Sequence, residues 1–260
     1  MAARRQSTYD HESAVMKVRL FCESPLTAGA LVTLPETPAH HARDVLRLAA
    51  GDEVTLLNGL GGEYTARLTL VSRKLVEAEV LAHTLRDAEP PHRISVAQSL
   101  ATGDKMDWVI EKAVELGAAC VVPVAAERSV LRLSPERAAR RVAHWQAIAR
   151  AACEQCGRNR LAQIEAVVTL DVYLASVKDA AGIKLMLSPV ADVAFRSLAA
   201  PVPGSTIHLL IGPEAGLTDA EEARARAAGF NSITLGPRVL RTETAALAAL
   251  AAIHARWGDF

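Results

Sequence analysis

The sequence predicts an α/β protein in which a small β-rich domain precedes a larger domain of alternating strands and helices. Short extended runs dominate residues 16–88, whereas strand and helix patterns alternate over residues 92–260. The polar stretch between them contains Pro90 and Pro91, and polar segments with proline are typical of domain boundaries. At 260 residues the chain is long enough for two domains of ordinary size.

The composition excludes several classes of protein. Half of the residues are hydrophobic and 22% are charged, which favours a buried core over disorder. Lysine and arginine number 29, as do aspartate and glutamate, so a polybasic coat is excluded while a local basic patch is not. Residues 1–15 are polar and lack the apolar segment of a secretory signal, and we predict a disordered extension there. No apolar run suits a membrane helix, and four cysteines make no disulfide scaffold, so a cytoplasmic location is expected.

The smaller domain reads as five short strands and one helix, which suggests a small barrel. The glycine-rich segment 58–62 lies between two extended runs and predicts a hairpin. A helix is expected over residues 38–48, where Val45, Leu46 and Leu48 are apolar. The expected strands are 18–21, 30–34, 54–57, 64–70 and 75–82.

The larger domain shows the strand–helix alternation of a parallel sheet that is covered by helices on both faces. Residues 207–211 are almost wholly apolar, as a central parallel strand requires. The expected strands are 94–100, 119–124, 183–187, 207–211 and 231–235. The expected helices are 104–116, 135–157, 169–178, 219–228 and 242–257.

Two similar segments near the C-terminus predict a ligand pocket. In LLIGPEAGLT (209–218) a buried strand ends, the chain turns through Gly212, and a helix begins with the capping-box pair Thr218 and Glu221. In LGPRVLRTETAALAAL (235–250) another strand end turns through Gly236. Ligands of open α/β sheets bind outside the carboxyl ends of strands, where glycine lets the backbone approach closely. The sequence therefore predicts that both bends contribute to one pocket.

The second of these segments also carries candidate functional residues. Thr242 is predicted as the N-cap of the last helix, and Glu243 suits its positive end. Arg241 stands just before that helix, beside the predicted pocket. The helix is apolar on nearly every side from Ala245 to Ile253, which fits either a buried helix or a subunit interface.

A local basic segment provides a candidate RNA contact. Residues 90–160 carry 11 basic and 7 acidic side chains. The excess lies between Arg128 and Arg160, and arginine matches phosphate geometry. A solvated helix face is the alternative explanation. The helix predicted in GDKMDWVIEKAVELG (103–117) places Lys105 off its apolar stripe.

Two other motifs lack the sequence context that their usual function requires. Cys153 and Cys156 have CxxC spacing, but no second pair or nearby histidine completes a zinc site, and no metal is expected. The glycines at 59–62 do not open a helix, as a dinucleotide-binding fingerprint requires. The alternation still leaves open a nucleotide-dependent, Rossmann-type oxidoreductase, or an RNA-binding protein without catalytic activity.

The two C-terminal segments together resemble the signature of SPOUT-class methyltransferases, and most closely the RsmE family of 16S ribosomal RNA uridine-N3 methyltransferases. Upstream segments resemble the same family in the same order, over residues 17–257. They are RLFC (19–22), HHARDVLRL (40–48), GDKMDWVIEKAVELG (103–117), ERSV (127–130) and EQCGRNR (154–160). The chain departs from the family pattern at Ala215, at Thr102 and at Leu161-Ala162.

The resemblance implies a PUA-like barrel that binds RNA, a SPOUT domain with a deep trefoil knot, a homodimer, and S-adenosylmethionine (SAM) as cofactor. It implies methylation of 16S ribosomal RNA in the small ribosomal subunit. Because the reacting uridine must develop negative charge, we expect Arg241, beside the predicted pocket, to stabilise that charge. The implied cofactor residues are Leu187, Ser188, Pro189, Ile211, Gly212, Pro213, Glu214, Gly216, Leu235, Gly236, Val239, Leu240 and Thr242. The resemblance implies RNA contacts at Arg19, His41 and Arg47, and the sequence pattern adds Lys105, Arg128 and Arg158 as candidate RNA contacts.

Overall fold

The computed structural model describes residues 18–260. The N-terminal extension predicted for residues 1–15 lies outside the described residues. The chain divides into two compact units, and each is described by itself. The smaller unit runs to Asn58 and resumes over Gly62–Leu85, and the larger comprises Gly59–Gly61 and Arg86–Phe260.

The smaller unit is built on a five-stranded sheet with the strand order β1-β3-β4-β5-β2. The strands are β1 (Arg19–Phe21), β2 (Leu31–Thr33), β3 (Glu53–Leu57), β4 (Glu63–Val71) and β5 (Val76–Thr84). β1 runs parallel to β3, and the other pairs are antiparallel. The predicted hairpin at the glycine-rich segment is confirmed, because it joins the antiparallel strands β3 and β4. Leu20, Leu56 and Leu68 lie in the buried core.

The helix expected over residues 38–48 is shorter and less regular than predicted. An α-helical turn, α1 (Glu36–His40), passes directly into a π-helical turn over His41–Val45. The Leu46 N–H donates to the oxygen of His41 at 2.9 Å, five residues back, as π geometry requires. The backbone then reverses at Arg47, whose φ is 55°. Apolar spacing indicated a helix but could not reveal the wider turn.

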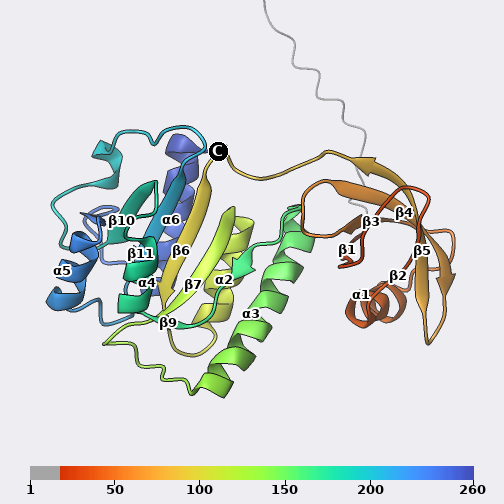
Figure 1. Ribbon diagram of the computed structural model, residues 1–260, viewed down its shortest axis with the longest axis horizontal. Helices are drawn as coiled ribbons and strands as arrows, with labels where there is room; N and C mark the ends of the chain where they lie inside the picture. The colour runs from red at the N-terminus through yellow and green to blue at the C-terminus, as the bar shows by residue number, and fades with distance from the viewer. Residues whose placement is uncertain (1–17) are drawn as a thin grey trace, which may run out of the picture. The chain divides into compact units, whose positions relative to one another are not determined.

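The larger unit contains a parallel sheet, as predicted, with the strand order β12-β10-β11-β6-β7-β8 (Figure 1). Each expected strand is present: β6 (Arg93–Ser99), β7 (Ala118–Ala125), β10 (Ile183–Leu187), β11 (Thr206–Ile211) and β12 (Asn231–Ile233). Three short elements were not predicted, namely β8 (Gln163–Ile164), β9 (Val168–Thr169), which pairs with β7, and a 3-10 turn at Phe195–Ser197. With two or three residues each, they are too short for a periodic pattern.

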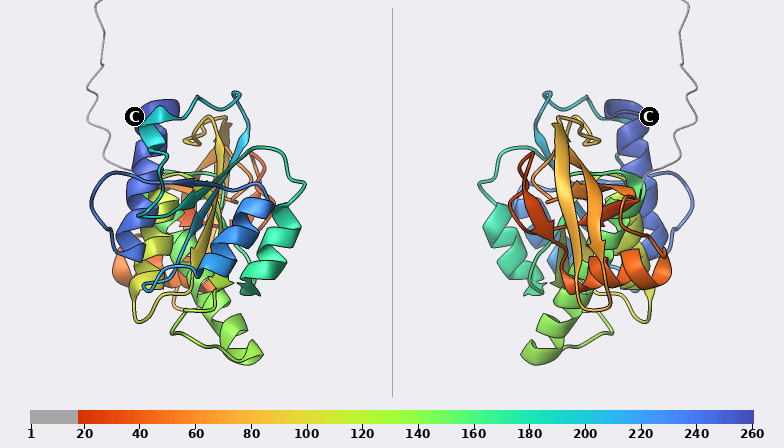
Figure 2. Two further views of the ribbon diagram at one scale, coloured as in Figure 1. Left: turned by 90° about the vertical axis from the view of Figure 1, so that its left-hand side faces the viewer. Right: turned by 90° about the vertical axis from the view of Figure 1, so that its right-hand side faces the viewer.

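Helices cover both faces of this sheet, as the alternation indicated. On one face lie α2 (Lys105–Glu115), α3 (Pro135–Cys156) and α6 (Thr242–Trp257), and on the other lie α4 (Leu170–Val177) and α5 (Asp219–Ala227). The left view of Figure 2 shows α4 and α5 on the side of the sheet opposite α6. Leu209 packs into the first core and Leu210 into the second, which explains why β11 is apolar apart from Thr206 and His208.

One predicted helix boundary needs correction. Arg241, and not Thr242, is the N-cap of α6, and it makes no side-chain capping bond. Thr242 is instead the first helical residue, since the extended backbone of Arg241 precedes it, and its hydroxyl forms hydrogen bonds inside the protein. Within residues 18–260, no helix is both long and apolar enough to cross a membrane. The knot and the closed barrel stay predictions.

Candidate active site

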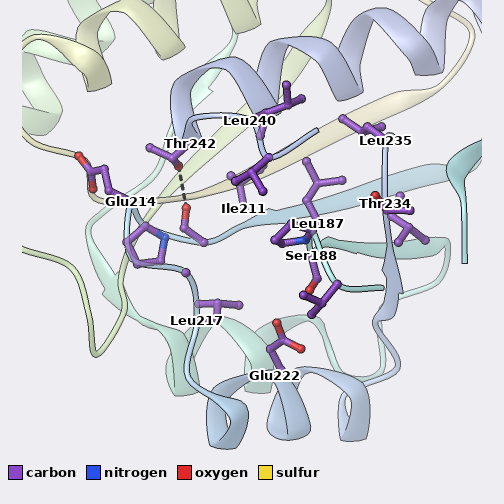
Figure 3. Close-up of a pocket in the computed structure, with 18 of the residues that line it drawn as sticks. Leu187, Ser188, Ile211, Glu214, Leu217, Glu222, Thr234, Leu235, Leu240 and Thr242 are labelled. Atoms are coloured by element: carbon purple, nitrogen blue, oxygen red, sulfur yellow. Dashed lines mark hydrogen bonds between the residues drawn. The ribbon is translucent and has the colours of Figure 1, made fainter. Parts of the chain in front are cut away.

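A pocket of about 290 Å³ lies at the carboxyl ends of three neighbouring strands, β10, β11 and β12. This volume is near the lower end of the range for small-molecule sites, roughly 300–1,000 Å³. The loop after β11 and the loop after β12 both line it, so the structure brings the two predicted bends together. Figure 3 shows their side chains converging from β10, β11, α5 and the start of α6.

Most of the predicted cofactor residues line this pocket. They are Leu187, Ser188, Pro189, Ile211, Gly212, Pro213, Glu214, Gly216, Leu235, Val239, Leu240 and Thr242. Gly236 lines a second cavity, which adjoins the pocket and shares Thr234, Leu235 and Arg238 with it. These residues therefore line two adjoining cavities, and their contact with a cofactor stays a prediction.

The loop after β11 is held in shape by its glycines and by its capping box. Gly216 has φ 72°, a left-handed conformation that glycine adopts without strain. At Gly212 a Cβ would lie 3.1 Å from the Leu217 backbone nitrogen, so a larger residue would displace the loop. The capping box of Thr218 and Glu221 is present as predicted. The buried Glu221 also accepts the Glu127 N–H at 2.7 Å, which ties α5 to the loop after β7.

A buried hydrogen-bond chain joins the walls of the pocket. The Thr242 hydroxyl donates to the Gly212 oxygen at 2.6 Å, the bond drawn in Figure 3. The same hydroxyl accepts from the Gln98 Nε2 at 2.8 Å, and Gln98 is fully buried at the end of β6. The chain thus connects β6, the bend after β11 and the start of α6, and this explains why Thr242 is not free to act as an N-cap.

Glu214 is the most strongly perturbed carboxylate of the site. Burial opposes its ionisation, but hydrogen bonds from its own N–H, from Thr102 and from Lys105 outweigh burial and lower its pKa to about 2. The Lys105 Nζ lies 3.0 Å from Glu214 Oε1, and the Thr102 N–H and hydroxyl each donate to that oxygen at 3.1 Å. Lys105 is therefore committed to the pocket wall, although it was predicted to contact RNA. Thr102, where the chain departs from the family pattern, supplies two of these bonds.

Sequence reasoning missed three charged residues of the pocket, Asp219, Glu222 and Arg238. Asp219 and Glu222 lie in the first turn of α5, and Figure 3 shows Glu222 pointing toward the cavity. The sequence signal that could have identified these two carboxylates was their position in the first turn of a helix that follows a strand-end loop. Arg238 lines the pocket, whereas Arg241 is exposed between the lining residues Leu240 and Thr242 without being part of the lining.

Two of the predicted RNA contacts are engaged inside the protein. Arg158 is 3% exposed, and its guanidinium donates to Glu89 and to the oxygens of Val114 and Ala118. The prediction that Arg158 contacts RNA is therefore corrected, because its side chain has a structural role inside the protein. The side chain of Arg19 is 8% exposed and pairs with Glu63 at 2.8 Å, which likewise speaks against an RNA contact.

Three other predicted RNA contacts are accessible. His41 and Arg47 are exposed on the smaller unit. Arg128 is exposed on the larger unit, where it lies 3.3 Å from the Ala215 oxygen in the pocket loop. Their contact with RNA stays a prediction.

The CxxC cysteines show no sign of reactivity. Burial raises the pKa of both the Cys153 and the Cys156 thiol, which disfavours the thiolate needed for redox or metal chemistry. Both belong to α3, and Cys153 packs in the core.

Comparison with known proteins identifies the two units. The family model of an RNA methyltransferase domain matches residues 88–254, and that of an RNA methyltransferase PUA domain matches residues 34–81. The class is thus an RNA methyltransferase. The chain is 35% identical to the Ribosomal RNA small subunit methyltransferase E of Bacillus subtilis, over 82% of this chain and 86% of the relative. The Synechocystis protein of that name is 32% identical, over 94% and 79%. The chain belongs to the family of ribosomal RNA small subunit methyltransferases E.

Solved structures agree over nearly the whole chain. The ribosomal RNA small subunit methyltransferase E of Neisseria gonorrhoeae, bound to SAM, superposes with a TM-score of 0.86 at 38% identity, covering 94% of this chain and 99% of that one. A Legionella pneumophila protein in complex with SAM gives a TM-score of 0.89 at 35% identity, covering 95% and 100%.

Proposed function

We propose that the pocket binds SAM and that the protein uses it to methylate ribosomal RNA. The observation that carries the proposal is the pocket at the ends of β10, β11 and β12, where two glycine-containing loops meet. Strand-end crevices of this kind are where open α/β sheets bind their ligands. Two solved relatives that superpose over nearly the whole chain hold SAM.

The chemistry of the lining fits SAM. Leu187, Ile211 and Leu240 offer an apolar surface for an adenine ring. The carboxylates of Asp219 and Glu222 suit a cofactor that carries a sulfonium and an ammonium group. The Ser188 hydroxyl is buried without a hydrogen-bond partner among residues 18–260, so a polar group is available in the wall.

We further propose N3 of a uridine as the methyl acceptor. SAM supplies a methyl group that is activated by a positively charged sulfur. The N3 proton would first pass to the solvent, which leaves negative charge on N3 and on the flanking carbonyl oxygens. The anion would then take the methyl group, and the carbon–sulfur bond would break to leave a neutral thioether. Arg241, at the edge of the pocket, would stabilise that charge in the manner of an oxyanion hole. The remaining acceleration comes from alignment of the reacting atoms.

The proposed substrate is 16S ribosomal RNA within the small ribosomal subunit. The curated relatives are named for that subunit, and the match to a PUA domain of RNA methyltransferases supports an RNA substrate. A homodimer and a cytoplasmic location complete the proposal. The largely apolar helix α6 supports a subunit interface, since Leu247, Ala248 and Ala252 remain only partly buried in the single chain.

The direct test uses a strain without the gene. Its 16S ribosomal RNA should lack one 3-methyluridine, and purified protein with SAM should restore that methyl group on small subunits from the strain. Methylation at another atom would refute the N3 assignment. SAM binding without any methyl transfer would favour an RNA-binding protein of the same fold, and hydride transfer from a nicotinamide cofactor would favour an oxidoreductase.

A further inference from the structure

The first two turns of α3 carry three exposed arginines. Arg137, Arg140 and Arg141, which we call the α3 ridge, are all exposed. Among the described residues, their guanidinium groups form neither an ion pair nor a hydrogen bond. Glu136 is the only acid between Arg128 and Arg150. Hydrogen bonds from its own N–H and from Ser134 lower its pKa and occupy its carboxylate at the helix N-terminus.

Local helix energetics oppose this cluster. Arg137 lies in the first turn, near the positive end of the helix dipole. Arg140 and Arg141 follow it at i+3 and i+4, where like charges are neighbours on a helix and repel. The helix is held further along its length, where Trp145 and Ala149 are fully buried. The ridge therefore contributes neither to packing nor to helix stability, and its positive charge is directed at the solvent.

The ridge is linked to the pocket by the loop between β7 and α3. Within this loop, Arg128 Nη1 lies 3.3 Å and 3.4 Å from the oxygens of Ala215 and Leu217 in the pocket loop. The Arg132 guanidinium donates to the Glu127 oxygen at 2.7 Å. Figures 1 and 2 show the N-terminal end of α3 projecting beyond the parallel sheet. A basic strip thus runs from the pocket wall to an exposed helix end.

We infer that the α3 ridge binds backbone phosphates of the RNA whose base reacts at the pocket. The inference rests on the proposed function, because it assigns the partner of that same site. Arginine presents a fork of donors that matches phosphate oxygens, and phosphate contacts position an RNA without reading its sequence. Since the whole chain carries no net charge, this local cluster determines where a polyanion is attracted.

The test replaces all three arginines with glutamine, as Arg137→Gln, Arg140→Gln and Arg141→Gln in one protein. With under-methylated small subunits as substrate, KM should rise about tenfold or more, while kcat and SAM affinity stay within about twofold. The dependence of log affinity for 16S RNA on log salt should become shallower by about two to three, roughly one for each lost phosphate contact.

Two further variants separate charge from structure. The corresponding triple lysine variant should retain most of the salt dependence, since it keeps the three charges. Arg224→Gln removes an exposed arginine that already pairs with Asp171 at 2.8 Å, and it should leave KM and the salt slope unchanged. An unchanged KM and slope in the triple glutamine variant overturn the inference. If the wild-type protein transfers no methyl group, the proposed function fails, whereas the salt slope of RNA binding still decides the role of the ridge.

Discussion

Arginines lie in the first turns of helix α3 and again just after its C-terminal end, yet the two groups serve opposite purposes. At the C-terminal end, Gly157 reverses the chain with φ 86°, and Arg158 turns inward to Glu89 and two backbone oxygens. At the N-terminal end, the α3 ridge is exposed, and its charges are not neutralised by the described part of the chain. The difference teaches that an arginine-rich sequence shows where charge is, whereas burial shows whether that charge holds the fold or remains available to a partner.

The largest loss of stability should come from Arg158→Ala, which removes the buried arginine of this comparison. The substitution removes the guanidinium that donates to the Glu89 carboxylate and to the oxygens of Val114 and Ala118. Loss of one partner from a buried ion pair costs about 3–5 kcal/mol of unfolding free energy. Urea unfolding measures it. Arg140→Gln is the matched control at the exposed end and should change stability by no more than about 0.5 kcal/mol. Equal effects at both ends would contradict the distinction.

The comparison can be extended to two exposed arginines at the pocket, of which Arg238 is part of the lining and Arg241 stands at its edge. Arg241→Ala should reduce kcat about 100-fold, or about 2.7 kcal/mol, with little change in SAM affinity, as expected for loss of one charge-stabilising donor. Single-turnover methylation and calorimetry measure the two quantities. If Arg238→Ala instead causes the loss of turnover and Arg241→Ala does not, the catalytic role belongs to Arg238.

Removing a buried hydroxyl of α6 should lower stability more than removing an exposed hydroxyl of the same helix. Thr242→Val removes the bonds to Gln98 and to the Gly212 oxygen, and the unsatisfied groups should cost about 1–3 kcal/mol. Because Gly212 shapes the pocket, SAM affinity should fall as well. Thr244→Val alters an exposed position of α6 and serves as the control, while Thr242→Ser should retain stability. Thermal unfolding with and without SAM provides the comparison.

The smallest effect concerns acid stability. The pKa of Glu214 is lowered in the folded state, so its contribution is fully present above its unfolded pKa near 4.5 and is lost as the pH falls toward about 2. Solvent screening limits that contribution to about 1 kcal/mol. Glu214→Gln should therefore flatten the loss of stability between pH 4.5 and 2, whereas Thr102→Val keeps the carboxylate and should preserve most of it. An identical acid transition in wild type and Glu214→Gln would contradict this assignment.

The sequence predicted the larger unit well because its signals are local and strong. Every expected strand and helix there is present, since apolar runs such as Ile207–Ile211 and caps such as Thr218 determine elements within a few residues. Short elements such as β8 were not predicted, because two residues are too few to show a periodic pattern. The π-helical turn at His41–Val45 was not predicted, because apolar spacing does not distinguish it from an α-helix.

The site was predicted in outline, and its polar details were not. Glycine-containing strand ends located the pocket, because backbone geometry depends on the residues of the turn themselves. The roles of Thr242, Lys105 and Arg158 depend on partners far along the chain, such as Gln98, and no local pattern reveals such partners. Whether a polar residue faces a ligand or the protein interior is therefore decided by tertiary contacts.

The proposed methyl transfer depends most directly on SAM binding in the pocket, and calorimetric titration of the wild-type protein and of Leu240→Trp measures this binding. Leu240 lines the pocket, and a tryptophan there would occupy part of its 290 Å³. We predict saturable binding of one SAM per wild-type chain, no binding of a nicotinamide dinucleotide, and an affinity for SAM lowered by at least about tenfold in the variant. Undiminished SAM binding by a folded Leu240→Trp protein, or displacement of SAM by the dinucleotide, would contradict the account.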